Sequence, residues 1–269
     1  MRYAICNETF DGWDHPRVCD TVAELGYTGL ELAPFTFGSR VTDVTAARRA
    51  EVRSRAESAG LEVVGLHWLL AKTEGFMLTS PDESVRAKTA EYLGELARAC
   101  RDFGGSLMVL GSPLQRRIPP GATYEQTTDY ALDTLSRVVP VLDEAGVDLC
   151  LEPLAPAEAD FFNTAAEGLA MMHRLKHPRV KLHLDVKAMS SETAPVPEVI
   201  RKYIGVTGHF HANDANKRGP GFGDVDFRPI LAALTEKEYA GWVSVEVFDY
   251  TPDPVTIARE SIRYLRECE

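Results

Sequence analysis

The chain has 269 residues, of which 45% are hydrophobic and 26% charged, and its formal net charge is -11. This composition is typical of a soluble globular protein, and the length suits one α/β barrel of about 250 residues. The excess negative charge repels phosphate backbones and anionic lipid, which disfavours binding to nucleic acid or to a membrane surface.

The cysteines and the N-terminal segment indicate the cellular compartment in which the protein is expected. The five cysteines form no C-x-x-C unit and are odd in number, which disfavours both a disulfide framework and thiolate zinc sites. The N-terminus reaches Asn7 and Glu8 too early to provide the hydrophobic region of a signal peptide. No apolar run approaches the ~20 residues that span a bilayer. The sequence therefore predicts a cytoplasmic protein without a membrane segment.

Short β-rich runs alternate with longer helical patterns along the whole chain. Most of these runs are continuously apolar, as expected of parallel strands covered by helices. The predicted strands are Tyr3–Cys6, Gly29–Ala33, Glu62–His67, Leu107–Leu110, Asp148–Glu152, Val180–Asp185, Val206–His211 and Trp242–Val247.

Helical patterns follow the strands, and several stop at a glycine suited to a helix C-terminus, such as Gly26, Gly60 and Gly146. The predicted helices are Pro16–Leu25, Val44–Ala59, Glu83–Phe103, Tyr124–Ala145 (with a kink at Pro140), Thr164–Leu175, Val196–Tyr203, Phe227–Leu234 and Pro254–Arg266. No G-x-G-x-x-G motif follows the first strand, which disfavours an open dinucleotide-binding sheet. The sequence predicts an α/β fold, a single (β/α)₈ TIM barrel domain over residues 1–269.

Four consecutive predicted strands end in side chains that can bind a metal. The strand ends LCLEP, KLHLD, GHFH and VSVEV place Glu152, Asp185, His211 and Glu246 there. Because the carboxyl ends of barrel strands share one rim, we expect these side chains to lie together. Three carboxylates gathered without a cation would repel one another, at a cost of several kcal/mol. The sequence therefore predicts one divalent metal ion, with Mn²⁺ as first choice and Mg²⁺, Co²⁺ or Zn²⁺ as alternatives.

Each residue of this set also has a simpler interpretation. Taken alone, a glutamate at a strand tip such as Glu246 is as often a solvated rim residue or a salt-bridge partner as it is a ligand. Taken alone, a histidine such as His211 is more often structural than a ligand. The conjunction of four such residues is what favours a metal site. His209 and His183 each lie two residues deeper in their strands, and Glu31 lies in the second strand, so these are candidates for supporting the ligands.

Two of the predicted ligands can also act as an acid/base pair. If Glu152 and Glu246 lie on opposite faces of a bound polyol, each can move a proton on its own face, while the metal stabilises an enediolate. Removing a proton on one face and returning one on the other inverts a carbon. Proton transfer between neighbouring carbons would give aldose–ketose isomerisation instead.

These residues resemble the xylose isomerase-like TIM barrel superfamily, which includes sugar phosphate isomerases/epimerases, and the metal set resembles that of the D-tagatose 3-epimerase group. The resemblance spans essentially the whole chain. The stretch HANDANKRGPGFGDVDF, His211–Phe227, is similar to the family's His-x-x-Glu/Asp, basic residue and Pro-Gly-x-Gly. The resemblance implies a metal-dependent isomerase or epimerase of a keto-sugar or related polyol, and a chain that can form a homo-oligomer. It also implies that Glu158, in the segment that starts at Glu152, contacts substrate hydroxyls.

The chain departs from this pattern at two positions. Ala188 stands where the family's ketose epimerases usually carry a histidine that touches the substrate, and Lys187 is a candidate to replace that histidine. Lys217, with Arg218 beside it, stands where an arginine is usual, so both are expected at the substrate. These changes leave the metal set intact and weaken the assignment of a free ketose as substrate.

Further candidates follow the third and fourth strands. Trp68 could stack on a sugar face while His67 bonds a hydroxyl, with core packing as the alternative. Arg116 and Arg117 could hold a phosphate or carboxylate, although surface arginines are the commoner explanation.

Three other functions compete with an isomerase or epimerase. The same site could serve a lyase, in which enolate formation on a 3-keto-glycoside expels the aglycone by β-elimination. A nuclease of the endonuclease IV type needs a three-zinc cluster with several more histidines, which seven histidines and a net charge of -11 disfavour. A sugar- or metal-binding barrel without turnover is the non-catalytic alternative, and Ala188 favours it.

Overall fold

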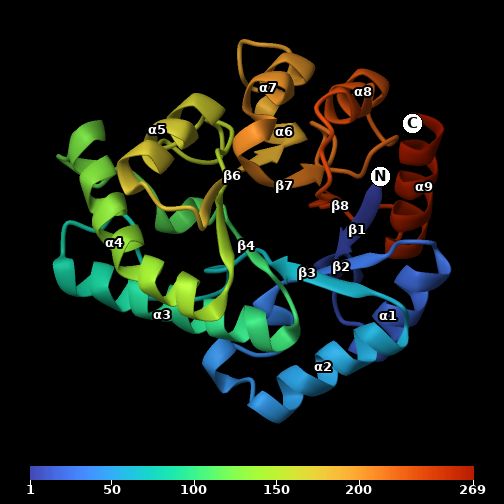
Figure 1. The fold of residues 1–269 in the computed structure, drawn as a ribbon, viewed down its shortest axis with the longest axis horizontal. Coiled ribbons are helices and arrows are strands. Elements are labelled where there is room, and N and C mark those ends of the chain that lie inside the picture. Colours follow the sequence, from blue (N-terminus) through green and yellow to red (C-terminus); the bar gives the residue numbers. More distant parts are fainter.

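Eight short, mainly apolar segments form the strands of a closed parallel barrel in the computed structural model, which describes residues 1–269 (Figure 1). The strands pair in chain order, and β1 pairs in parallel with β8 to close the barrel. The strands are β1 (Arg2–Cys6), β2 (Gly29–Leu32), β3 (Glu62–Leu66), β4 (Leu107–Leu110), β5 (Asp148–Leu151), β6 (Val180–Asp185), β7 (Thr207–Ala212) and β8 (Trp242–Val245). The predicted α/β fold, a (β/α)₈ TIM barrel, is confirmed.

Helices surround the barrel (Figure 1), and most begin after a side chain that accepts a backbone N–H of the first turn. Asp14, Thr45 and Thr123 play this part before α1, α2 and α4. The helices are α1 (His15–Glu24), α2 (Ala46–Ser58), α3 (Glu83–Phe103), α4 (Tyr124–Ala145), α5 (Ala165–Leu175), α6 (Val186–Met189), α7 (Val196–Tyr203), α8 (Arg228–Glu236) and α9 (Pro254–Glu267). None of them is long and apolar enough to cross a membrane.

The structure adds one short helix to the predicted elements, and it keeps Pro140, at which the sequence predicts a kink, inside α4. The short helix α6 directly follows β6 and is not among the predicted helices, because its four residues carry no periodic pattern. Asp185 begins α6 by accepting the backbone N–H of Ala188 at 2.7 Å. The last residue of β6 is therefore held by the turn that follows it.

The side chains inside the barrel change from apolar to polar towards the carboxyl ends of the strands. A cluster of 65 buried residues packs between the strands and the helices, while a smaller cluster of six lies on the strands alone and includes Ala4, Val109 and Cys150. Alternation along the strands places Cys150 on the same side as the residue after β5, Glu152. Apolar side chains thus occupy the lower part of the barrel, and buried polar side chains follow at the carboxyl ends of the strands.

Candidate active site

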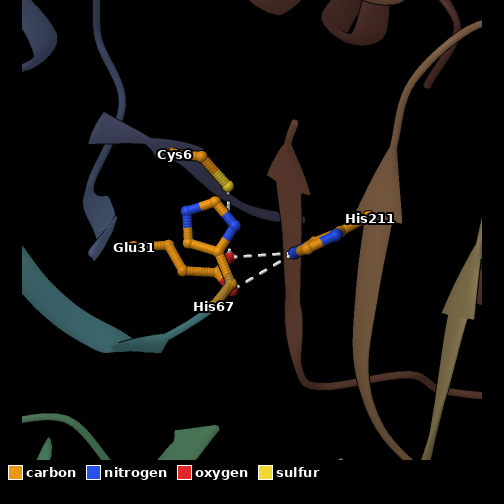
Figure 2. Close-up of side chains that lie close together, drawn as sticks. All are labelled: Cys6, Glu31, His67 and His211. Atoms are coloured by element: carbon orange, nitrogen blue, oxygen red, sulfur yellow. Dashed lines mark hydrogen bonds and ion pairs between the residues drawn. The ribbon is translucent and has the colours of Figure 1, made fainter. Parts of the chain in front are cut away.

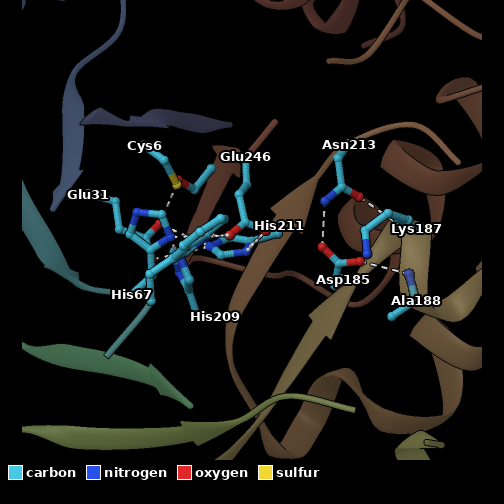
Figure 3. A network of polar contacts seen from close by, with 12 residues as sticks. Cys6, Glu31, His67, Asp185, Lys187, Ala188, His209, His211, Asn213 and Glu246 are labelled. Carbon is cyan, nitrogen blue, oxygen red and sulfur yellow. Dashed lines mark hydrogen bonds and ion pairs between the residues drawn. The ribbon is translucent and has the colours of Figure 1, made fainter. Parts of the chain in front are cut away.

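The four predicted metal ligands lie at the carboxyl ends of β5 to β8, and all four side chains are buried. His211 Nδ1 lies 3.0 Å from Oε2 of Glu246 (Figure 3). Glu152, Asp185 and His211 each have one potential ligand atom, and these atoms all lie within 4.8 Å of one another. The structure therefore brings the four side chains together around His211.

His183 joins the same group of potential ligands. Its ring lies 4.2 Å from that of His211, centroid to centroid. Both of its nitrogens are buried and lack a hydrogen-bond partner. Burial, followed by the neighbouring His211 and His209, holds the pKa of His183 well below its usual range. A neutral imidazole with free nitrogens can serve as a ligand or as a support, whereas the sequence suggested only the second role.

The carboxylates of this group strongly influence one another. Burial, then the charges of Glu246 and Asp185, raise the pKa of Glu152 to about 8. Burial also raises the pKa of Asp185. Burial acts in the same direction on Glu246, but the charge of His211 and hydrogen bonds from His211 and His67 hold its pKa well below the usual range. Carboxylate oxygens and imidazole nitrogens suit a divalent cation, and its charge would offset their repulsion. The residues present therefore fit a metal ion.

A buried carboxylate, Glu31, faces the second ring nitrogen of His211, the one that does not contact Glu246 (Figure 2). His211 Nε2 is 3.1 Å from Oε2 of Glu31, and His209 Nε2 is 2.9 Å from the same oxygen. Cys6 Sγ also contacts Oε2 of Glu31, at 3.6 Å. A carboxylate that receives the Nε2–H of an imidazole leaves the Nδ1 lone pair free for a metal. Glu31 thus has the supporting position that the sequence suggested.

Asn213 orients Asp185 in a similar way, and sequence reasoning missed it. Its Nδ2 donates to Oδ2 of Asp185 at 2.6 Å, and its Oδ1 accepts the backbone N–H of Lys187 at 2.8 Å (Figure 3). The signal was its position in the motif His211-Ala-Asn213, two residues beyond a predicted ligand.

His67 and Trp68 hold Glu246 from the opposite wall of the barrel. Trp68 Nε1 donates to Oε1 of Glu246 at 2.8 Å, and His67 Nδ1 lies 3.2 Å from the same oxygen. On its other side, His67 Nε2 is 2.8 Å from Oε2 of Glu8, a buried carboxylate two residues beyond the end of β1 that sequence reasoning did not select. These contacts place both aromatic side chains against the proposed acid/base residue.

Trp68 has a backbone conformation that is unusual for a bulky residue. Its φ of 53° lies in the left-handed region, where a side chain causes steric strain. Its ring stacks on Phe248, with centroids 5.9 Å apart and an interplanar angle of 28°. Such strain persists where the surroundings fix it, often at ligand sites.

A cavity of about 520 Å³ opens beside these residues, between the loops that follow β3 and β4. Of the predicted site residues, those that line it are His67, Trp68, Glu152, Glu158 and Glu246. Asp185 and His211 do not line it. A molecule in the cavity would therefore meet a tryptophan and four carboxylates, since Glu74 from the loop after β3 also lines it.

Lys187 forms a bidentate ion pair with Glu158. Its Nζ lies 2.7 and 2.6 Å from the two carboxylate oxygens and 4.7 Å from the ring centroid of Phe248. The lysine side chain is buried, and Phe248 and Glu158 both line the cavity. Of the basic residues that the sequence offers near the substrate, Lys187 is the one that the structure places beside the cavity, next to Ala188.

The other basic candidates point elsewhere. Lys217 is exposed, and Arg218 pairs with Asp249, Nε to Oδ2, at 3.0 Å; neither lines the cavity. Arg116 is buried rather than at the surface, and it donates to the backbone oxygens of Glu152 at 2.5 Å and of Phe162 at 3.1 Å. Its guanidinium therefore fixes the chain after β5 and is not presented to a phosphate. Arg117 is exposed.

Known proteins resemble this chain in sequence and in structure. The family model described as xylose isomerase-like TIM barrel matches residues 19–268. L-ribulose 3-epimerase of Mesorhizobium japonicum is 33% identical over 64% of this chain and 58% of its own length, so this match spans less than two thirds of that relative. D-psicose 3-epimerase of Ruminiclostridium cellulolyticum is 28% identical over 87% of this chain and 78% of its own. The crystal structure of D-psicose 3-epimerase from Clostridium cellulolyticum H10 superposes with a TM-score of 0.84 at 22% identity, covering 100% of this chain and 99% of that one.

These similarities bear on two of the predictions. The family model confirms the resemblance on which the sequence analysis relied. The two curated relatives are named as sugar 3-epimerases, which supports the prediction of an enzyme of the sugar isomerase or epimerase kind.

Proposed function

We propose that this chain, which belongs to the xylose isomerase-like TIM barrel family, is a divalent-metal-dependent epimerase of a keto-sugar or related polyol. The observation that carries the proposal is the convergence of Glu152 and Glu246 on one cavity, with Asp185 and His211 buried beside them. The sugar 3-epimerase relatives support the same class of reaction.

The metal would be held by Glu152, Asp185, His211 and Glu246, with Mn²⁺ as first choice and Mg²⁺, Co²⁺ or Zn²⁺ as alternatives. When bound, a divalent cation supplies positive charge that makes a C–H bond beside a carbonyl group more acidic and stabilises the charge that develops on the substrate oxygens. Glu31 and Asn213 keep His211 and Asp185 in position for this purpose.

The protein's own groups would move the protons. Glu246 removes the proton from the carbon on one face of the sugar, and Glu152 returns a proton to the other face; the reverse reaction exchanges their roles. His67 and Trp68 direct Oε1 of Glu246, while Arg116 fixes the backbone at Glu152. Each carboxylate is therefore held by a separate part of the barrel.

Glu158 and Lys187 would bind the sugar's hydroxyl groups. The family resemblance implies that Glu158 contacts substrate hydroxyls; its place in the lining of the cavity supports this role, and the ammonium group of Lys187 fixes its carboxylate. Lys217 and Arg218 lie outside the cavity, so their predicted contact with substrate would require the loop after β7 to move.

The test is metal-dependent exchange of solvent deuterium into keto-sugars. We expect apo-enzyme to show none, Mn²⁺ to restore it, and the inverted sugar to form. Either Glu152→Gln or Glu246→Gln should reduce formation of the inverted sugar by about 10²–10⁴-fold, because inversion needs a proton-transfer group on each face. Wild-type metal affinity with no exchange into any keto-sugar would instead indicate a binding protein, and no metal affinity would refute the proposal. Release of aglycone from a 3-keto-glycoside without formation of an epimer would assign the lyase.

A further inference from the structure

Four fully buried side chains inside the barrel bring potential metal-binding atoms together (Figure 2). They come from β1, β2, the residue after β3 and β7, and they are Cys6, Glu31, His67 and His211. One potential ligand atom of each lies within 4.8 Å of those of the other three. Cys6 Sγ is 3.6 Å from Oε2 of Glu31, and His211 Nε2 is 3.1 Å from the same oxygen. Of these four residues, only His211 belongs to the proposed catalytic metal set.

The barrel strands hold this set of donors. Cys6 and Glu31 are partners in the register of β1 and β2, so the backbone places them side by side. His67 directly follows β3, and His211 lies within β7. Sites built on strands are held more precisely than sites built on loops. His67 also lines the cavity, which gives an ion a path from solvent to the set.

Cys6 differs from the other buried cysteines in its surroundings. Each of the other three belongs to one of the two apolar clusters, whereas Cys6 belongs to neither. Its Sγ contacts the carboxylate of Glu31 and lies 3.8 Å from Oγ of Ser244. A buried cysteine usually behaves as a small apolar side chain, and a thiol is only a weak hydrogen-bond donor. A sulfur atom placed among imidazoles and a carboxylate is better suited to binding a metal.

The charges around this set also favour a second cation. Five carboxyl groups are buried near the two imidazole rings, namely Glu8, Glu31, Glu152, Asp185 and Glu246. One divalent ion at the proposed catalytic site offsets only two negative charges, and buried charges without partners are costly. A second divalent ion adds two positive charges, while the thiol of Cys6 loses one proton to solvent when it binds the ion. Binding therefore reduces the excess of negative charge.

We propose that Cys6, Glu31, His67 and His211 form a second metal site, which is selective for Zn²⁺ and shares His211 with the proposed catalytic site. One sulfur, two nitrogens and one oxygen suit tetrahedral Zn²⁺, whose bond lengths place neighbouring ligand atoms about 3.4–3.6 Å apart. Three carboxylates and one imidazole, as at the catalytic site, suit harder ions such as Mn²⁺. The four ligands are far apart in the chain, so no cysteine spacing in the sequence indicates this site.

The shared histidine couples the two sites. Its Nδ1 faces Glu246 of the catalytic set, and its Nε2 faces Glu31 of the second set. A neutral imidazole carries one proton, which must leave before both nitrogens can bind metal. An ion at either site should therefore weaken binding at the other, and this effect is reciprocal, with a typical size of about 5–150-fold. Zn²⁺ at the second site would thus act against the catalytic Mn²⁺.

The test uses Cd²⁺ as a probe for Zn²⁺, because a Cd²⁺–thiolate bond absorbs in the ultraviolet. We expect one equivalent of Cd²⁺ to produce this absorption in the apo-enzyme. Cys6→Ser should abolish it and leave the affinity for Mn²⁺ close to that of the wild type. Cys100→Ser is the matched control, because Cys100 is equally buried and its Sγ donates to the backbone oxygen of Leu107 at 3.2 Å. The control should keep the absorption.

A second measurement needs no variant. X-ray absorption of wild-type enzyme with one equivalent of Zn²⁺ should show one sulfur ligand at about 2.3 Å. Zn²⁺ without a sulfur ligand, or a Cd²⁺–thiolate absorption that survives in Cys6→Ser, would overturn the second site.

Asp185→Asn separates the two sites, since Asp185 belongs to the catalytic set alone. This variant should lose Mn²⁺ binding and keep the Cd²⁺–thiolate absorption; loss of both would mean that there is only one site. In the wild type, excess Mn²⁺ should raise the dissociation constant of Cd²⁺ by about 5–150-fold, and in Asp185→Asn it should not. Equal constants with and without Mn²⁺ in the wild type would show that His211 is not shared.

This inference goes beyond the proposed function and can fail independently of it. Mn²⁺-dependent epimerisation without any thiolate-bound metal would overturn the second site and leave the epimerase proposal standing. Thiolate-bound metal in a protein that turns over no keto-sugar would support the second site and count against the epimerase.

Discussion

The two halves of the barrel contribute differently to the site. The proposed metal ligands all come from β5 to β8, namely Glu152, Asp185, His211 and Glu246. The half formed by β1 to β3 contributes side chains that contact two of these ligands instead. Glu31 contacts His211, and His67 contacts Glu246 (Figure 3). Trp68 also contacts Glu246, and Glu8 contacts His67 from behind. One half thus supplies all the proposed ligands, and the other half orients two of them, His211 and Glu246.

This division has an energetic consequence. Loss of a ligand removes an interaction with the reacting atoms, whereas loss of an orienting group leaves the ligand present but less well placed. Substitutions of the ligands from β5 to β8 should therefore have larger effects than substitutions of the orienting groups from β1 to β3.

The largest effect is expected for Glu246→Gln. The substitution keeps the shape of the side chain but removes the group proposed to take the proton, so kcat should fall by about 10²–10⁴-fold. Rates of deuterium exchange measure the loss, and thermal unfolding checks that the variant is folded. Retention of more than about a tenth of the wild-type rate would show that Glu246 is not the base.

A smaller effect is expected for Glu31→Gln, in the orienting half. The carboxylate can only accept a hydrogen bond from His211, whereas the amide of Gln can present either its oxygen or its NH₂ group. The tautomer of His211 is then fixed less firmly, so metal affinity should fall about 10–100-fold. Titration of the apo-enzyme with Mn²⁺ gives the dissociation constant. Glu62→Gln is the matched control, because Glu62 is an exposed carboxylate paired with Arg2. An affinity as high as that of the control would remove Glu31 from the orienting set.

Lys187→Met should mainly affect substrate binding. The variant leaves Glu158 without its cationic partner, so we expect KM to rise about tenfold with a smaller change in kcat. A double-mutant cycle with Glu158→Gln should show a coupling of about 0.5–3 kcal/mol, since the two residues are in direct contact. Additive effects would mean that the ion pair does not act on the substrate.

The smallest effect is expected for Lys217→Ala. The side chain is exposed and lies outside the cavity, so the free energy of unfolding should change by less than about 0.5 kcal/mol and KM should change less than in Lys187→Met. Denaturant unfolding and steady-state kinetics measure the two quantities. A rise in KM as large as that of Lys187→Met would show that the loop after β7 closes on the substrate.

The sequence alone was sufficient for the architecture and for the four proposed ligands. Alternating strand and helix patterns are local, and parallel strands that close into a barrel bring their carboxyl ends to one rim whatever the details of packing. Residues that end successive strands, such as Asp185 and His211, are therefore expected to meet before any contact is known. The structure brings them together as expected.

Only the tertiary structure decided which other side chains join them. His67 and Glu246 lie 179 positions apart in the chain, and no local pattern reports such a contact. The direction of a loop side chain depends on what packs against it, which is why Arg116 turns inward to backbone carbonyls while Lys217 faces solvent. The barrel geometry determines where residues at strand ends lie, whereas the direction of a loop side chain is determined by the groups that pack against it.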